Sequence, residues 1–160
     1  SQAIRANGVG HTPHVEPTLA LTRLIYASRP TIAVDPQYVN AILREAREHN
    51  ERQRLTGVLA VRPNLFLQII EGDRRNISRL YNRIVNDKRH KDVVIISCEA
   101  IQKRAFCSWE MGYVPLSSTN RHILLRYSAT AELKPEQMTP DNIVACVVEL
   151  IQAQDQRQVA

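Results

Sequence analysis

The sequence predicts an α+β fold of the ferredoxin-like class, with the element order βαββαββ and a five-stranded mixed sheet. Short apolar runs of strand length alternate with two segments in which apolar residues recur at helical spacing. In residues 55–61 and 93–96 apolar residues occupy positions of both alternating sets, so both faces of the sheet need cover. We therefore expect two helices on one face and the C-terminal helices on the other.

The first strand and the first helix are set by turn and cap residues. The apolar run of residues 19–28 predicts a strand, because it is short and is followed directly by an Arg-Pro dipeptide. Asp35 and Pro36 are typical of an N-cap followed by the first position of a helix. The apolar stripe of that helix ends on a polar residue, Asn50.

Further strands and one more helix follow in the rest of the unit. Four further strands are expected, at residues 55–61, 65–70, 93–101 and 106–114. Only three residues separate the first two of them, which predicts an antiparallel hairpin. Asp73 is a candidate N-cap for a second helix over residues 74–87. Further helices are expected at residues 121–127 and after Thr139-Pro140.

Length and composition limit the class of protein. The 160 residues carry 21 basic and 16 acidic side chains, a net charge of +5, and divide into an arm (1–18), a core unit (19–115) and a helical extension (116–160). No apolar run approaches the ~20 residues of a membrane span. Cys98, Cys107 and Cys146 match no zinc pattern, so free thiols in the cytoplasm are expected.

Basic residues are concentrated in the second helix and just beyond it. Seven basic residues and one acidic residue lie between positions 74 and 91, and Arg75, Arg79 and Arg83 form a row one helical turn apart. A solvated face, a partner surface or a nucleic-acid footprint would each account for this row. Aromatic residues make only 5% of the chain, which disfavours a base-stacking sheet. No conventional catalytic or metal-binding pattern is found, so an enzyme is not expected.

Polar side chains placed within apolar elements are the candidate functional residues. Tyr26 lies in the first strand, Gln68 lies between Leu67 and Ile69, and Asn50 ends the first helix. Each could be satisfied inside a core, but a buried amide left unpaired costs about 1–3 kcal/mol. Together they favour a polar, planar ligand between the two helices. Trp109 and Met111, two apart on the last expected strand, should share one face.

These residues carry a resemblance to a known family. The motifs are RLIYAS at 23–28, AREHN at 46–50, LTGVL at 55–59, FLQIIEG at 66–72, DKRH at 87–90 and FCSWEMG at 106–112. In this order they resemble the BLUF domain, a blue-light sensor that uses FAD. The resemblance covers residues 19–115, and the tail is similar to that of short, effector-less members of the PixD type.

The resemblance implies a role for each candidate residue. Tyr26 would donate an electron to the excited flavin, and Gln68 would link that phenol to the flavin ring. Trp109 and Met111 would relate the flavin to the output surface. The residues that it implies for cofactor binding are Tyr26, His49, Asn50, Gln68, Arg89, His90 and Met111.

The resemblance also implies the biological role. It predicts a cytoplasmic photoreceptor with non-covalent FAD, with FMN or riboflavin as alternatives, and a reversible red-shifted signalling state. The partner would be a response-regulator-like protein or a cyclic-nucleotide enzyme, and a dimer or larger ring is expected. Neither a membrane nor a nucleic acid is an expected partner. The alternative is a flavin-free ferredoxin-like module that binds nucleic acid or an acidic partner.

Overall fold

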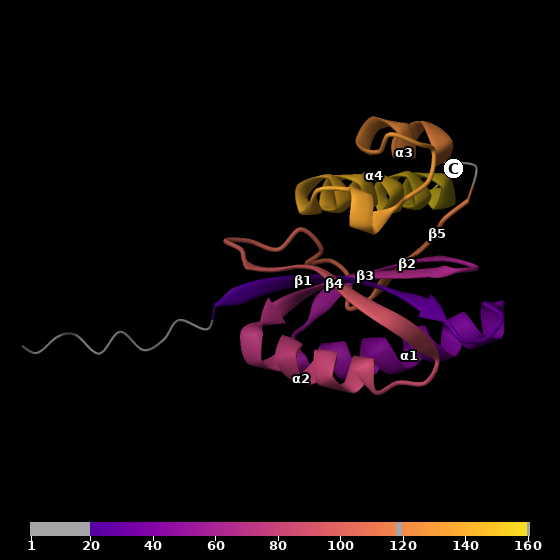
Figure 1. Cartoon of the computed structure of the whole chain (residues 1–160). Coiled ribbons are helices and arrows are strands. Elements are labelled where there is room, and N and C mark those ends of the chain that lie inside the picture. The colour runs from indigo at the N-terminus through magenta and orange to yellow at the C-terminus, as the bar shows by residue number, and fades with distance from the viewer. Residues whose placement is uncertain (1–19, 118–119, 160) are drawn as a thin grey trace, which may run out of the picture.

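A computed structural model describes residues 20–117 and 120–159, which form one sheet with helices on both faces (Figure 1). The predicted arm, residues 1–18, lies outside the described residues. The elements are β1 (Leu21–Pro30), α1 (Pro36–Gln53), β2 (Thr56–Arg62), β3 (Leu65–Asp73), α2 (Arg74–Val85), β4 (His90–Ala100), β5 (Gly112–Pro115), α3 (Arg121–Tyr127), a 3₁₀ turn (Pro135–Gln137) and α4 (Pro140–Val159). The predicted order βαββαββ is confirmed.

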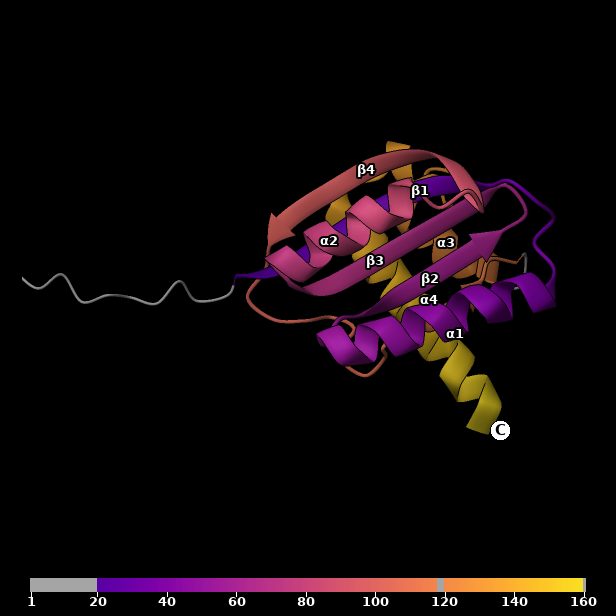
Figure 2. The same cartoon turned by 90° about the horizontal axis from the view of Figure 1, so that it is seen from below.

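The sheet has the strand order β4-β1-β3-β2-β5. All neighbours pair antiparallel except β2 and β5, which run parallel, so the predicted mixed sheet is confirmed. The β2–β3 hairpin forms as expected, with a tight turn at Pro63 and Asn64. The first strand of the chain therefore lies inside the sheet, between two strands that come later in the sequence (Figure 2).

Both principal helices begin at the predicted caps. The Asp35 carboxylate accepts a hydrogen bond from the backbone N–H of Tyr38 at 2.8 Å, and Pro36 occupies the first helical position. The Asp73 carboxylate accepts from the backbone N–H groups of Arg75 and Asn76. Each cap satisfies N–H groups that the first turn of a helix cannot pair internally.

Alternation along the strands divides the core between the two faces of the sheet. α1 and α2 cover one face and α4 covers the other, as expected (Figure 1). Strand residues such as Ile25 and Ile69 pack against α4, while their neighbours Leu24 and Ile70 pack against α2. The inward stripe of α4 consists of Ile143, Cys146, Val147, Leu150 and Ile151. Both faces of the central strands β1, β2 and β3 are therefore covered, whereas β4 at the sheet edge stays largely exposed.

The last strand differs from the prediction. We expected it to span residues 106–114, but β5 begins at Gly112, and residues 101–111 form no helix or strand. This segment instead crosses the end of the sheet, from the β4 edge to the β5 edge (Figure 2). Phe106 and Met111 of this segment are buried by tertiary contacts rather than by strand pairing, and Phe106 is fully buried. We call residues 101–111 the crossover segment.

Within the described part of the chain, no helix is both long and apolar enough to cross a membrane.

Candidate functional site

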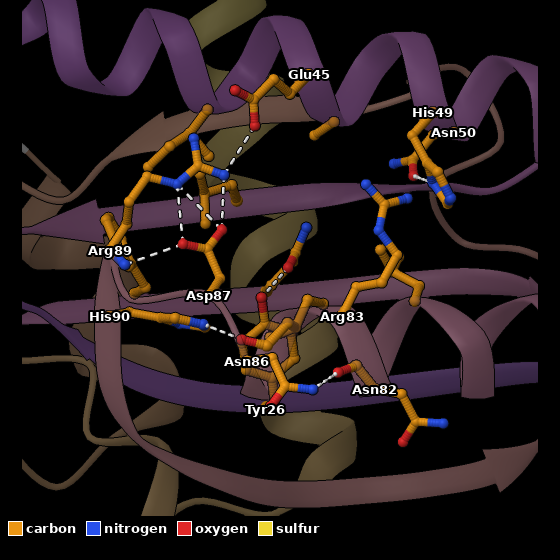
Figure 3. Close-up of a pocket in the computed structure, with 17 residues that line it drawn as sticks. Tyr26, Glu45, His49, Asn50, Asn82, Arg83, Asn86, Asp87, Arg89 and His90 are labelled. Atoms are coloured by element: carbon orange, nitrogen blue, oxygen red, sulfur yellow. Dashed lines mark hydrogen bonds and ion pairs between the residues drawn. The ribbon is translucent and has the colours of Figure 1, made fainter.

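A cavity of about 560 Å³ lies between α1 and α2, over the sheet face that these helices cover (Figure 3). This volume is within the usual range for small-molecule sites, ~300–1,000 Å³. The residues that line it are Tyr26, Ile42, Glu45, Ala46, His49, Asn50, Leu59, Phe66, Gln68, Leu80, Asn82, Arg83, Ile84, Asn86, Asp87, Arg89 and His90. Six of the seven residues expected to bind a cofactor are therefore brought together.

Tyr26 and Gln68 lie side by side in the sheet at the floor of the cavity. They are direct cross-strand partners on β1 and β3, so their side chains leave the same face of the sheet. The Tyr26 hydroxyl donates a hydrogen bond to Gln68 Oε1. Gln68 Nε2 lies 3.6 Å from the sulfur of Met111. The Gln68 amide is thus held at both ends, by the phenol and by the thioether.

The Tyr26 phenol is strongly held in its protonated form. Burial raises its pKa far above the ordinary value, and the negative charge of Asp87 raises it further. Tyr26 therefore carries its proton at any physiological pH. This proton leaves only if the electronic state of the phenol changes, for example by loss of an electron from the ring.

His49 and Asn50 form the wall of the cavity at the end of α1. Asn50 is almost completely buried, and its Nδ2 donates to the backbone carbonyl of Glu110 at 2.6 Å. His49 Nδ1 lies 3.5 Å from Asn50 Oδ1. The same amide thus borders the cavity and fixes the end of the crossover segment.

An ionic cluster lies at the opposite end of the cavity. The Arg89 guanidinium bridges Glu45 of α1 at 2.8 Å and Asp87 at 2.6 Å (Figure 3). The hydrogen bonds from Arg89 hold the pKa of Asp87 below its usual range, while those carboxylates raise the pKa of Arg89. The cluster ties α1 to the loop after α2 and so fixes the width of the cavity.

Replacing Asp87 by Asn should lower the free energy of unfolding only where the carboxylate is ionised. Because the folded-state pKa is depressed, its contribution is present above the ordinary carboxyl pKa of about 3.9 and is lost as the pH falls through the lowered value. Since the pair is partly exposed, we expect about 0.5–1 kcal/mol at pH 7. Urea unfolding from pH 7 down to pH 3 should show the difference disappearing. The exposed Asp155→Asn is the control, and a difference that grows toward low pH would contradict the assignment.

His90 connects the cavity to β1 through two hydrogen bonds. Its Nε2 lies 2.5 Å from the carbonyl of Ile84, which can only accept, so this nitrogen carries a hydrogen. Its Nδ1 lies 2.7 Å from Ser28 Oγ and, in the neutral ring, accepts from that hydroxyl. The imidazole is thereby fixed edge-on to Tyr26, with ring centroids 6.3 Å apart.

Arg83 is the cavity residue that the sequence reasoning assigned wrongly. We expected it to point outward with Arg75 and Arg79, but it lines the cavity and extends from α2 toward α1 (Figure 3). Among the described residues Arg83 has no ion-pair partner, whereas Arg89 is neutralised by two carboxylates. Asn82 and Asn86 lie on either side of Arg83 in the sequence, next to the apolar stripe of α2, and they also line the cavity. These polar residues at the edge of the stripe are the signal that the sequence reasoning missed.

Trp109 and Met111 do not share a face, contrary to expectation. Met111 is buried with residues of α1 and β2, whereas Trp109 packs against the cluster that contains α4. A Cβ placed on Gly112 would lie 2.6 Å from Ile151 Cδ1 and 3.4 Å from Trp109 Cγ, which places the indole on the α4 side. Both residues precede β5, so strand alternation does not apply to them. Met111 is absent from the cavity lining, but it contacts Gln68 and packs in one cluster with the lining residues Leu59 and Phe66.

The cavity combines apolar walls with a few convergent polar groups. The apolar lining consists of Ile42, Ala46, Leu59, Phe66, Leu80 and Ile84. Amide, imidazole and guanidinium groups face the same space from α1, α2, β3, β4 and the loop after α2. This donor set fits a flat heterocycle with polar atoms along its edges. No cluster of three or more potential metal ligands occurs within residues 20–117 and 120–159.

A family profile decides the identity of this site. The profile of the BLUF family, described as sensors of blue-light using FAD, matches residues 21–112. The chain belongs to the BLUF family. The matched range contains every candidate residue from Tyr26 to Met111. BLUF domains are sensory modules and not catalytic domains, so this site is a sensor site rather than an active site.

Relatives and solved structures agree with the BLUF assignment. The photoactivated adenylate cyclase subunit beta of Euglena gracilis is 36% identical over 88 residues, 55% of this chain and 10% of that protein. The chain therefore spans about a tenth of this curated relative. The dark-state structure of BlrB, a BLUF protein, is 29% identical, has a TM-score of 0.67, and the match covers 84% of this chain and 97% of that chain. Photo-activated BlsA is 28% identical with a TM-score of 0.73, over 82% of this chain and 94% of that chain.

Proposed function

We propose that the chain is a blue-light receptor that binds FAD non-covalently and passes a reversible signal to a partner protein. The observation that carries this proposal is the Tyr26–Gln68–Met111 chain in the floor of the cavity. It connects a buried phenol to the crossover segment through one amide. The division into sensor (19–115) and extension (116–160) is part of the proposal.

The cavity fits the flavin ring system. The ring would lie between α1 and α2, with its dimethylbenzene part against the apolar lining and its pyrimidine edge toward His49, Asn50 and Arg83. Arg89 and His90 would border its polar side. Among basic residues that could contact a diphosphate tail, Arg89 belongs to the lining, whereas Arg29, Arg47 and Lys88 are absent from it. FMN and riboflavin are the alternatives that a binding experiment must distinguish from FAD.

The chemistry of the response resides in Tyr26 and Gln68. A bound flavin would supply a one-electron acceptor that blue light activates. Tyr26 would give up the electron, and its hydroxyl proton would pass along the existing hydrogen bond to Gln68 Oε1. When an electron and a proton return to Tyr26, the Gln68 amide would be left rotated or in its imidic form. Because no bond to the cofactor is made or broken, the state would revert in the dark.

The signal would leave the site through the crossover segment. A rotated Gln68 amide no longer directs Nε2 toward Met111, and the segment that carries Met111 also carries Trp109 on the α4 side. The C-terminal helices are therefore the proposed output surface. Euglena relatives are named as photoactivated adenylate cyclases, so a cyclic-nucleotide enzyme or a response-regulator-like protein is the proposed partner class, with the protein acting as a cytoplasmic homo-oligomer.

The colour of the protein tests the proposal. We expect the purified protein to be yellow with flavin absorption bands, because the cavity retains the cofactor. Blue light should shift these bands to the red, and they should return in darkness. Extraction and chromatography of the pigment would identify the flavin. A colourless protein that does not bind added FAD, FMN or riboflavin would exclude the receptor and leave the flavin-free binding module.

A further inference from the structure

The crossover segment has no hydrogen-bonded ladder of its own, so side chains from the sheet and α1 determine where it lies. Near β5 it is held by Gly57 N–H to the Trp109 carbonyl at 3.0 Å, by Asn50 to the Glu110 carbonyl and by Gln68 to Met111. The contacts of Asn50 and Gln68 border the proposed flavin site. At the middle of the segment the Arg104 guanidinium donates to Thr56 Oγ1 and to the Glu71 carbonyl, and a further anchor there is a side chain of β3.

That anchor is Glu71, three residues after Gln68 on β3. Its carboxylate is fully buried and accepts hydrogen bonds from the backbone N–H of Ala105 at 3.0 Å and of Phe106 at 2.7 Å. Arg23 on β1 balances the charge, with Nε and a terminal nitrogen within 2.9 Å of Oε2. Hydrogen bonds to an ionised acceptor are about twice as strong as neutral ones. Glu71 therefore holds the middle of the segment through two charge-assisted hydrogen bonds.

Two β3 side chains thus hold the same stretch of chain at two points. Glu71 fixes Ala105 and Phe106, and Gln68 contacts Met111 only five residues later. Phe106 is fully buried, so it cannot shift independently of the packing around it. Releasing the segment at Glu71 would loosen the position of Met111 against the Gln68 amide.

We propose that Glu71 is a positioning residue of the photocycle, which sets the lifetime of the red-shifted state by holding the crossover segment against Gln68. This inference rests on the proposed function. Return to the dark state requires the Gln68 amide to turn back within a close-packed wall, and a rigid wall raises the barrier to that rotation. Loosening the wall lowers the barrier, so dark recovery becomes faster.

The test is dark recovery of the flavin-loaded Glu71→Gln variant, followed by absorbance after a blue flash. The new amide keeps one acceptor for Phe106 N–H but presents an NH₂ group to Ala105 N–H, which breaks that contact. We expect unchanged flavin content, a red shift that is still present, and recovery at least about threefold faster. Glu99→Gln, the same change at an exposed carboxylate, should recover at the wild-type rate.

A further pair of variants separates positioning from stability. Arg23→Gln removes the ion pair but not the contacts to Ala105 and Phe106, so it should lower the melting temperature with little effect on recovery. In a protein that already carries Met111→Leu, Glu71→Gln should not accelerate dark recovery further, because both substitutions act through the contact between Met111 and Gln68. If Glu71→Gln does not fold, Glu71→Asp retracts the carboxylate by one methylene, keeps its charge, and should also recover faster.

Unchanged recovery in both Glu71 variants would overturn the inference and leave Glu71 a structural residue. The same conclusion follows if Arg23→Gln accelerates recovery as much as Glu71→Gln does, because general destabilisation would then explain both. Failure of the proposed function is seen separately, as a wild-type protein without flavin or without a red shift.

Discussion

Replacing Tyr26 by Phe should abolish the reversible red shift while flavin remains bound. Phe keeps the ring that packs in the cluster with Leu24 and Ile77, so the cavity floor is preserved. It removes the hydroxyl that donates to Gln68 Oε1, and with it the proton that must move when an electron is lost. The measurement is the light-minus-dark absorbance difference, which should fall below a few per cent of the wild-type amplitude.

Tyr81→Phe is the matched control for this experiment. It removes a phenolic hydroxyl from the same apolar cluster, on α2 rather than on β1. That variant should bind flavin and show the full red shift. A normal photocycle in Tyr26→Phe would instead show that the electron and the proton come from elsewhere, and the roles assigned to Tyr26 and Gln68 would be wrong.

Replacing Gln68 by Leu should also eliminate the red shift, for a different reason. The side chain keeps its approximate size but loses the amide whose rearrangement changes the hydrogen bonds at the flavin. The Tyr26 hydroxyl also loses its acceptor within a buried site, so we expect a loss of about 1–3 kcal/mol in the free energy of unfolding. Absorbance after illumination and urea unfolding measure the two effects separately.

The exposed Gln137→Leu controls for the loss of an amide elsewhere in the chain and should change neither property. A Gln68→Leu protein that still shifts to the red would place the spectral change outside this amide. A protein that loses both flavin and stability would show that Gln68 is chiefly a structural residue.

Local signals in the sequence were sufficient for the elements that begin at caps and turns. Asp35 and Asp73 predicted both helix starts because an N-cap depends only on its neighbours in the chain. The alternation of Leu24 to Ala27 between the two faces follows from strand geometry alone. The stripe of α1 that ends at Asn50 predicted correctly that this amide is directed inward.

Features that depend on long-range packing were not visible in the sequence pattern. The apolar spacing of residues 106–114 is typical of a strand, but Phe106 is buried by its contacts and β5 is only four residues long. Burial without strand pairing gives the same residue pattern as a strand, so the faces of Trp109 and Met111 were assigned wrongly. Register is also a long-range property, and only the family resemblance placed Tyr26 beside Gln68.

Arg83 illustrates the same limit for charged residues. Helical spacing places it in a row with Arg75 and Arg79, yet that row turns around the helix enough to bring Arg83 to the cavity. An outward face and a ligand-facing edge are adjacent on an amphipathic helix, and a long side chain at their boundary can reach either one.

The position of β1 inside the sheet also governs how the chain is completed during synthesis. β1 is synthesised before its two neighbours, β3 and β4, which end at Asp73 and Ala100. One edge of β1 is therefore completed only 43 residues after Pro30 and the other only 70 residues after it, and the far face of the sheet is covered later still, when the stripe of α4 emerges. Such distant pairings make folding slow and leave apolar surface uncovered meanwhile. Nascent chains that stall before α4 would expose that surface and become targets for chaperones.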